Sequence, residues 1–387
     1  MGTTIQKLAE SVSLIASAQT WIEGKATQQL IKTSQLNDML HVAGMPDLHP
    51  GRGYPIGAAF FTRNTLYPAL VGNDIGCGMG LWQTSVKLAK VNVEKLAKRL
   101  IDVEDPLDST WDAEIATLKR QKRIETDDYD KALGTIGGGN HFAEFQAIDD
   151  VVDEATFAAL GLDKSRLQLL VHSGSRGLGQ SILVDHVSRF SHNGLKPSDS
   201  DFSDYLEKHD EAVRWAELNR DLIAKRFLQA IRESGQPILD VNHNLVVPKS
   251  IDGQQGWLHR KGATPSDQGC VVIPGSRGDF SYLVRPCELG KSHDVSLFSL
   301  AHGAGRKWQR GDCQGRLSHK YKKEDLLRTA LGSRVICGNK ELLYDEAPQA
   351  YKKCASVVGD LVDAGLVSIV ATLRPVLTFK TQGECGK

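Results

Sequence analysis

The sequence lacks several features that would place it in a specialised class of protein. It has no run of 18 apolar residues that could cross a membrane as a helix, and no basic-then-apolar signal pattern at its start. Lys and Arg number 47, equal to Asp and Glu, so any surface for nucleic acid must be local. The seven cysteines are odd in number and include no Cys-x-x-Cys pair, which favours free thiols over a disulfide framework. We therefore expect a cytoplasmic protein with no membrane partner.

The length and hydrophobic content indicate a large buried core. A chain of 387 residues with 41% hydrophobic residues has the composition of a globular protein, and length alone suggests two or three domains. The candidate site residues described below run from position 74 to position 380. Because one site draws on almost the whole length, we expect a single interwoven domain over residues 1–387. Helical and strand patterns mix along the chain, which is typical of an α+β fold of mixed β-sheets with surrounding helices.

Periodicity and breakers predict the main elements. The clearest amphipathic pattern predicts a helix over 204–233, and Asn92 is a suitable N-cap for a helix ending at Val103. Further helices are expected over 27–41, 180–190 and 348–364, the last of these carrying Tyr351. Strands are expected over 81–86, 166–172, 238–247, 296–301 and 367–379. Residues 45–57, with three prolines and three glycines, predict a loop, and the charged stretch 104–131 predicts a solvated helix face.

Residues 71–80 hold an aspartate and a cysteine among glycines. Asp74 and Cys77 lie three positions apart and are surrounded by Gly72, Gly76, Gly78 and Gly80. Glycine at this density favours a shaped loop over a helix or a continuous strand. A carboxylate and a thiol on one loop are plausible ligands of a transition metal. A glycine-rich turn with a buried thiol is the simpler interpretation of this stretch taken alone.

Three histidines in similar settings favour the metal site. His141 and His172 adjoin glycine-rich turns, and His243 stands between two asparagines, a setting more often typical of a buried structural histidine. A closed zinc site needs four ligands, whereas five ligands of mixed hardness suit two metals that share the thiolate. A fourth histidine, His302, precedes the glycine turn 303–305 and lies close to Arg306. It is placed to contact a phosphate or to attack one.

Six short motifs resemble those of the RtcB RNA ligases and occur in the same order. They are Asp-Ile-Gly-Cys-Gly-Met, Gly-Gly-Asn-His-Phe, His-Ser-Gly-Ser-Arg-Gly, Asn-His-Asn, Ile-Pro-Gly-Ser and His-Gly-Ala-Gly-Arg, which begin at positions 74, 138, 172, 242, 273 and 302. The resemblance extends from about residue 45 to residue 380. Within the family, the compact length and the variant loop 48–52 are most similar to the branch coupled to release factor H.

The resemblance implies a reaction and its cofactors. Enzymes of this family join an RNA 3′-phosphate or 2′,3′-cyclic phosphate end to a 5′-hydroxyl end, with GTP as co-substrate and two Mn²⁺ ions. One metal is assigned to Asp74, Cys77 and His141, and the other to Cys77, His172 and His243. His302 becomes the nucleophile that accepts GMP from GTP. The branch resemblance implies repair of nicked transfer or ribosomal RNA beside a release factor homologue.

The resemblance also implies a guanylate pocket, in which Tyr351 matches an aromatic residue that stacks on guanine. The implied set is Asn140, His141, Phe142, Ala143, Glu144, His243, Asn244, Pro274, Gly275, Ser276, Arg277, Ser281, His302, Gly303, Ala304, Gly305, Tyr351 and Lys380. The chain departs from the family pattern at Arg52, where lysine is usual, and at Arg277, where methionine is common. The stretch 104–131 is also shorter than in longer relatives. None of these departures removes a proposed ligand or the nucleophile, but they put the choice of substrate in question.

Two other functions are compatible with parts of the pattern. A binuclear metallophosphoesterase acting on RNA ends would need the five ligands but not His302. A non-catalytic RNA-binding accessory of a release factor homologue would need neither. A local excess of basic residues, eight Lys or Arg against three acids over 306–328, predicts an RNA-docking surface that includes Lys320, Lys322 and Lys323.

Overall fold

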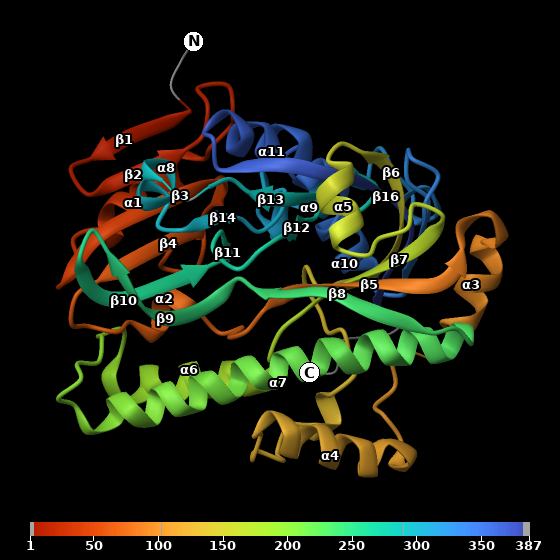
Figure 1. Ribbon diagram of the computed structural model, residues 1–387, viewed down its shortest axis with the longest axis horizontal. Coiled ribbons are helices and arrows are strands. Elements are labelled where there is room, and N and C mark those ends of the chain that lie inside the picture. The colour runs from red at the N-terminus through yellow and green to blue at the C-terminus, as the bar shows by residue number, and fades with distance from the viewer. Residues whose placement is uncertain (1–3, 102, 289, 382–387) are drawn as a thin grey trace.

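Two β-sheets lie side by side in the protein (Figure 1). The computed structural model describes residues 4–101, 103–288 and 290–381. The six-stranded sheet has the order β1 (Ile5–Ala9), β2 (Val12–Ile15), β3 (Met39–His49), β4 (Ile56–Thr62), β10 (Gln254–Lys261), β9 (Asn244–Ile251). The eight-stranded sheet has the order β12 (Val271–Ile273), β13 (Ser281–Pro286), β16 (Val367–Thr381), β6 (Phe142–Val151), β7 (Arg166–Ser173), β5 (Gly78–Lys87), β8 (Gly235–Asn242), with β15 (Arg334–Cys337) paired to β16.

Helices surround the two sheets, which confirms the predicted α+β class. The α-helices are α1 (Gly24–Thr33), α2 (Pro68–Val71), α3 (Val93–Arg99), α4 (Asp112–Lys122), α5 (Glu154–Ala159), α6 (Gly177–Phe190), α7 (Ser200–Ile231), α8 (Lys291–Val295), α9 (Arg310–Leu317), α10 (Lys340–Asp345) and α11 (Cys354–Asp363). Short 3₁₀ turns are η1 (Leu88–Lys90), η2 (Ser109–Trp111), η3 (Asp130–Ala132), η4 (Glu324–Leu327) and η5 (Pro348–Ala350). No helix within the described ranges is long and apolar enough to cross a membrane. All six cysteines in those ranges are free thiols.

One uninterrupted path carries the chain from one sheet into the other. Strand β8 pairs with β5 in the large sheet, and β9 pairs with β10 in the six-stranded sheet, with only His243 between them. The predicted single strand 238–247 is therefore wrong, because it divides at His243. The backbone N–H of His243 donates to the Cys77 carbonyl at 2.7 Å, and its carbonyl accepts from Ala263 N at 3.1 Å. Ala263 begins β11 (Ala263–Pro265), which pairs with β14 (Ser299–Ala301).

Helix α7 runs beneath the large sheet (Figure 1) and confirms the expected amphipathic helix with slightly earlier bounds. It begins at Ser200 and ends at Ile231, because Arg232 takes a left-handed conformation with φ of 60°. Its apolar positions are buried, Phe227 against the large sheet and Trp215 among residues that include those of α4 and α6. An amphipathic helix gains most of its stability from such packing.

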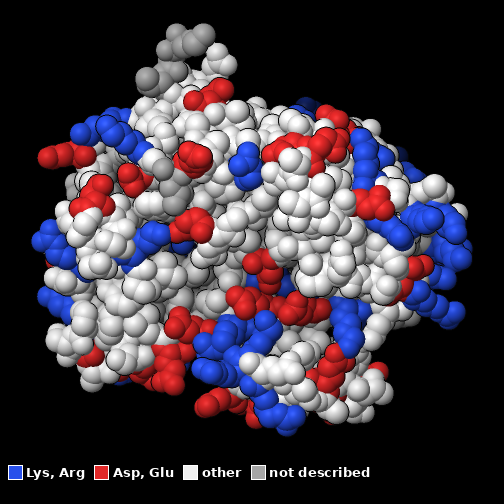
Figure 2. Space-filling view, in the orientation of Figure 1, with Lys and Arg blue, Asp and Glu red and all other residues white. Residues whose placement is uncertain are grey.

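The charged stretch 104–131 forms α4 and its flanking turns, and the prediction of a fully solvated face is only partly right. Lys122 lies 3.6 Å from Glu217 on α7, and acidic and basic side chains are interspersed over α4 and α7 (Figure 2). Lys119 is buried, with a side chain 7% exposed, and pairs with Asp127 and with Asp130 at 2.7 Å. A buried ammonium group needs such partners.

Two predictions near the N-terminus are wrong. The helix expected over 27–41 ends at Thr33, and β3 begins at Met39 within the expected helix. The loop expected over 45–57 is largely strand, since β3 runs to His49 and β4 begins at Ile56. The pairing of β3 with β4 skips from Gly44 to His49, so Pro46 has no ladder hydrogen bond to break. Such a bulge lets a strand contain proline.

Other predicted boundaries of helices and strands differ from those in the structure for local reasons. Asn92 caps α3 as predicted, its side chain accepting from Lys95 N at 2.9 Å, but the helix ends at Arg99. Only Ser299–Ala301 is strand in the stretch 296–301, because Leu297 and Phe298 have φ values of 55° and 49°. The expected helix 348–364 divides into η5 and α11, and Tyr351 lies between them.

Candidate functional site

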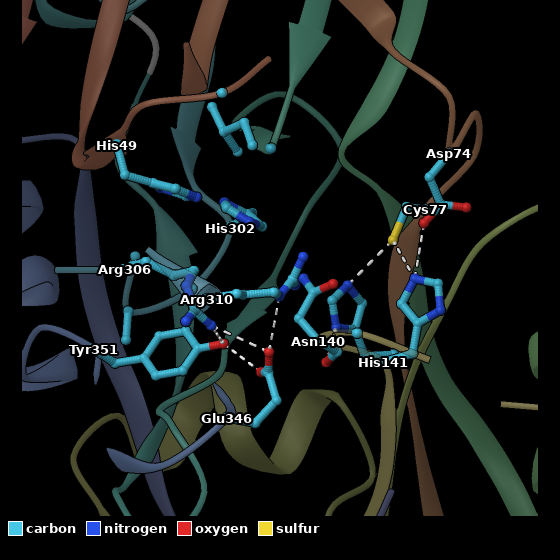
Figure 3. A pocket seen from close by; sticks show the side chains of 18 of the residues that line it. His49, Asp74, Cys77, Asn140, His141, His302, Arg306, Arg310, Glu346 and Tyr351 are labelled. Atoms are coloured by element: carbon cyan, nitrogen blue, oxygen red, sulfur yellow. Dashed lines mark hydrogen bonds and ion pairs between the residues drawn. The ribbon is translucent and has the colours of Figure 1, made fainter. Parts of the chain in front are cut away.

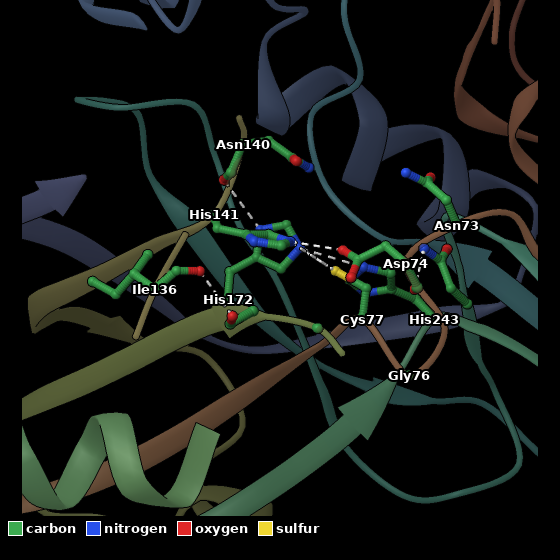
Figure 4. A network of polar contacts seen from close by, with 12 residues as sticks. Asn73, Asp74, Gly76, Cys77, Ile136, Asn140, His141, His172 and His243 are labelled. Carbon is green, nitrogen blue, oxygen red and sulfur yellow. Dashed lines mark hydrogen bonds and ion pairs between the residues drawn. The ribbon is translucent and has the colours of Figure 1, made fainter. Parts of the chain in front are cut away.

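Five potential metal ligands gather at one edge of the eight-stranded sheet (Figure 4). The strand register explains this, because Met79 and Phe142 both lie opposite His172, on either side of β7. His141 directly precedes β6, and Cys77 directly precedes β5. Gly78 lies opposite Asn242, so His243 follows at the same edge. Neighbouring strand ends therefore bring together residues that are far apart in the sequence.

A tight turn supplies Asp74 and Cys77. The Cys77 N–H donates to the Asp74 carbonyl at 3.1 Å, and Gly76 N donates to the Asn244 carbonyl at 2.8 Å. Gly76 has a φ of +70°, and a Cβ there would lie 2.8 Å from the Ala216 Cβ on α7. Only glycine allows both this conformation and this close approach. The turn is thereby fixed against α7.

The ligand atoms face one another at short distances. The Cys77 Sγ lies 3.2 Å from His172 Nε2 and 3.4 Å from His141 Nε2. His141 Nε2 lies 2.8 Å from Asp74 Oδ2, and His172 Nε2 lies 3.4 Å from His243 Nε2. Two groups of three ligands result, Asp74–Cys77–His141 and Cys77–His172–His243, and they share the thiol. Within each group the ligand atoms lie within 4.8 Å of one another.

The electrostatics of the cluster fit a bound cation. Burial lowers the pKa of His172 and of His243 well below the usual histidine range, so both rings are neutral and can ligate. Burial and the neighbouring Asp74 raise the pKa of the Cys77 thiol well above its usual value. A thiolate at this position therefore requires a compensating positive charge, which a metal ion supplies. The donor set of thiolate, imidazole and carboxylate suits a transition metal.

A buried arginine on α7 hydrogen-bonds to the chain segments that carry the potential ligands. Arg220 on α7 is fully buried and donates to the carbonyls of Gly76 and Ser173 at 2.7 and 2.9 Å. It also donates to Asp240 Oδ1 at 2.6 Å and to Asn242 Oδ1 at 2.7 Å. One guanidinium group thus links the turn before β5, the end of β7 and the end of β8. Sequence reasoning missed Arg220, although a charged residue on the apolar face of α7 was a usable signal.

His302 lies beside the cluster and is held by a buried aspartate. Its ring centroid lies 4.9 Å from that of His243. Its Nδ1 lies 2.6 Å from Asp47 Oδ2, and the same oxygen accepts from the His302 backbone N–H at 3.2 Å. Asp47 is completely buried on β3. From the sequence alone Asp47 is only one residue of the loop expected over 45–57, because its partner is 255 positions away.

Two further groups fix the position of Asp47. Lys352, which is buried, donates through Nζ to the carbonyls of Pro46 and Leu48 at 2.7 and 3.0 Å. His49 Nδ1 donates to the Asp47 carbonyl at 2.9 Å, and its ring lies nearly parallel to that of His302 with centroids 6.4 Å apart. Burial lowers the pKa of His49 to about 3, so this ring is neutral. Lys352 and His49 therefore fix Asp47, and Asp47 in turn fixes the position of the His302 imidazole.

A cationic cluster lies across the cavity from His302 (Figure 3). Arg306 Nη1 donates to Glu346 Oε1 at 3.1 Å and to the Tyr351 hydroxyl at 3.0 Å, and its guanidinium also lies over the Tyr351 ring. Arg310 and Lys380 approach the same carboxylate at 3.4 and 3.7 Å. Burial alone would raise the pKa of Glu346, but these three cations lower it to about 2. Three positive charges around one carboxylate leave a net attraction for anions.

Glu144 forms a separate polar group in the wall. It is buried on β6, where it accepts from Gln146 Nε2 at 2.6 Å and from the Thr378 hydroxyl. Burial raises its pKa to about 7, although these hydrogen bonds oppose the rise. Gln146 also donates to the Ser281 hydroxyl at 2.9 Å. Near neutral pH this carboxyl group can either donate or accept a hydrogen bond.

One cavity of about 1120 Å³ contains most of the predicted site residues. Its walls include Asp74, Cys77, Asn140, His141, Phe142, Glu144, His172, His243, Asn244, Pro274, Gly275, Ser276, Arg277, His302, Gly303, Ala304, Gly305, Tyr351 and Lys380. Two predicted residues lie outside these walls: Ala143 packs in the core, and the Ser281 hydroxyl accepts from Gly275 N at 3.3 Å. Arg277 donates to the Leu343 carbonyl at 2.8 Å. Glu346 and Arg310, which sequence reasoning missed, also line the cavity.

Comparisons with known proteins agree with the motifs. The family described as tRNA-splicing ligase RtcB matches residues 29–105 and 102–381. The RNA-splicing ligase RtcB2 of Escherichia coli is 55% identical over 383 residues, which cover 99% of both chains. The tRNA-splicing ligase RtcB of Nanoarchaeum equitans is 30% identical over 425 aligned positions, which cover 88% of each chain. The RNA-splicing ligase RtcB of E. coli K12 is 29% identical over 415 aligned positions, which cover 93% of this chain and 95% of the relative. On this extent of similarity, the chain belongs to the RtcB family.

Proposed function

We propose that this protein is a GTP- and Mn²⁺-dependent RNA ligase that joins RNA 3′-phosphate or 2′,3′-cyclic phosphate ends to 5′-hydroxyl ends. The observation that carries the proposal is the Asp47–His302 pair, which places an oriented imidazole between the five-ligand cluster and the cationic cluster. The names of the relatives, which are RNA-splicing and tRNA-splicing ligases, agree with this activity.

The contact with Asp47 decides which nitrogen of His302 reacts. Nδ1 lies 2.6 Å from the Asp47 carboxylate, which favours the tautomer with the proton on Nδ1, so Nε2 keeps its lone pair and is the proposed nucleophilic atom. In the proposed reaction Nε2 attacks the α-phosphorus of GTP, a P–N bond forms, and the bond to the departing pyrophosphate breaks. Water first opens a 2′,3′-cyclic end to a 3′-phosphate. GMP then passes from Nε2 to the RNA 3′-phosphate as the P–N bond breaks, and the 5′-hydroxyl displaces GMP to form the phosphodiester. The aspartate stabilises the positive charge that develops on the ring.

The metal ligands would hold two Mn²⁺ ions, with Asp74, Cys77 and His141 on one and Cys77, His172 and His243 on the other. Bound metals neutralise the negative charge of the reacting phosphates and orient them. Thiolate and imidazole would prefer zinc or copper on affinity alone, so the use of manganese depends on metal availability and geometry. The cationic cluster would attract the nucleotide, with Tyr351 available to stack on guanine. The basic stretch 306–328 remains a predicted RNA-docking surface.

The contact between Asp47 and His302 predicts a specific kinetic defect. Asp47→Asn keeps the shape of the side chain but removes the charge that orients and stabilises His302. We expect the rate of covalent GMP transfer to fall by about 100-fold or more, with little change in GTP affinity. Single-turnover transfer of labelled GMP, beside equilibrium GTP binding, measures the two quantities separately. An unchanged transfer rate would show that Asp47 has only a structural role.

The biological task we propose is repair of RNA broken within the translation machinery, beside a release factor homologue. The variant loop residue Arg52 lines the cavity, and Arg277 lies in its wall, so both can affect which RNA is bound. We expect higher kcat/KM for a nicked, structured transfer or ribosomal RNA than for a short linear RNA with the same ends. Direct competition between the two at saturating GTP and manganese measures this preference. Equal kcat/KM values would remove the case for a specialised substrate.

A further inference from the structure

A second, smaller cavity adjoins the large one and has aromatic walls. It measures about 440 Å³ and is lined by Trp21, Glu23, Lys307, Trp308, Gln309, Asp312 and Arg316. Four of these residues, Glu23, Lys307, Trp308 and Gln309, also line the large cavity. The two cavities are therefore adjacent and share part of their walls.

Hydrogen bonds hold the chain beside each of the two tryptophans, and Trp308 also packs partly against the core around α9 and α10. Trp21 is 46% exposed, and the adjacent Thr20 hydroxyl donates to Asp360 Oδ2 at 2.5 Å. The backbone N–H of Trp308 donates to the Ala350 carbonyl at 3.3 Å, and its backbone carbonyl accepts from Arg306 Nε at 3.1 Å. Arg306 is a member of the cationic cluster, so this contact links the backbone of Trp308 to the large cavity. A tryptophan side chain has few rotatable bonds and loses little conformational entropy when it binds a ligand.

The charges of the smaller cavity indicate what kind of group it binds. Lys307 and Arg316 are balanced by Glu23 and Asp312, so a phosphate gains no net attraction inside it. The Arg316 guanidinium lies over the Trp308 ring, 5.1 Å from its centre, and forms part of that wall. Flat, neutral, partly polar groups are best suited to such walls, and a nucleobase has all three properties.

We propose that the cavity between Trp21 and Trp308 binds one unpaired base of the RNA strand next to the break. This inference rests on the proposed function, since it takes the large cavity to be the place where RNA ends react. Stacking on aromatic side chains tolerates any base, so the site would select unpaired structure and not sequence. The cavity would thus favour RNA whose nucleotides beside the break are frayed or looped out.

The test combines base deletion in the RNA with deletion of the aromatic rings. Binding of a fluorescent single-stranded RNA with a 3′-phosphate is measured by anisotropy for the wild type, Trp21→Ala, Trp308→Ala and Trp21→Phe. Each protein is tested with RNAs that carry one abasic nucleotide at successive positions from the end. Val184→Ala on α6 removes a comparably exposed apolar side chain elsewhere and serves as the control. Thermal unfolding verifies that each variant is folded.

The proposal predicts that one abasic position weakens binding to the wild type by about tenfold. Trp21→Ala should weaken binding of the intact RNA to a similar degree and be insensitive to that abasic position, and Trp21→Phe should restore most of the affinity. Equal affinities for wild type and both alanine variants would overturn the proposal. So would an alanine defect that is independent of the base, because the rings would then contact the sugar–phosphate backbone of the RNA and not a base. Because the assay measures binding without ligation, failure to join RNA ends would contradict the proposed function separately.

Discussion

Replacing His302 with alanine should abolish the covalent GMP adduct. The variant removes the only group proposed to form a bond to phosphorus, so transfer of labelled GMP from GTP should fall at least 1,000-fold, as is typical when a nucleophile is removed. The measurement is incubation with labelled GTP and manganese, followed by a denaturing gel, which retains only covalent label. Metal content should remain near the wild-type value, because His302 is in neither group of ligands.

The same experiment distinguishes the proposed RNA ligase from the main alternative function. A binuclear metallophosphoesterase acting on RNA ends would use the metal ligands without forming a GMP adduct, and it would lose little activity with His302→Ala. His192→Ala is a useful matched control, since His192 is an exposed histidine that does not line the cavity. An undiminished adduct in His302→Ala would contradict the assignment of the nucleophile.

Replacing Cys77 with alanine should lower occupancy at both metal positions. Cys77 is the one residue shared by the two groups of ligands, so its loss leaves two ligands in each. Metal analysis of the protein saturated with manganese and GTP should give about two ions per chain for the wild type and well under one for Cys77→Ala, because three protein ligands are the usual minimum for a metal site.

His243→Ala is the control for the shared position. It removes a ligand from one group only, so about one ion per chain should remain, held by Asp74, Cys77 and His141. If the wild type saturates with a single ion, the shared-thiolate arrangement is wrong. If the Cys77 and His243 variants lose the same amount of metal, the thiol does not bridge.

Sequence patterns predicted the long helix α7 and its apolar stripe because both depend on residues close together in the sequence. They failed for residues 27–57, where tertiary pairing overrides local preference. Val42 and its neighbours on β3 are buried between β2, β4 and α1, and Pro46 lies where the pairing of β3 with β4 skips from Gly44 to His49. No periodicity within a short window reports the bulge, because it is defined by the partner strand.

The motifs indicated the metal ligands, since each stands on its own recognisable loop. The residues that orient them could not be identified in the same way. Asp47 acts through a partner 255 positions away, and Glu346 pairs with three cations from different segments. Arg220 is a charged residue on the apolar face of α7, a signal of unusual burial, but the helix pattern does not show which groups its guanidinium contacts. Their importance follows from burial and contact, which only the fold defines.

The position of β16 has a consequence for how the protein is made. This last strand inserts between β13 and β6, near the middle of the eight-stranded sheet, and carries Lys380 into the cavity. During synthesis at about 5–20 residues per second, β6 would wait roughly 10–40 s for this partner. Throughout that interval its open edge can pair with other chains. The nascent protein is therefore aggregation-prone until its final segment emerges, and we expect its yield to depend on chaperones that cover this edge.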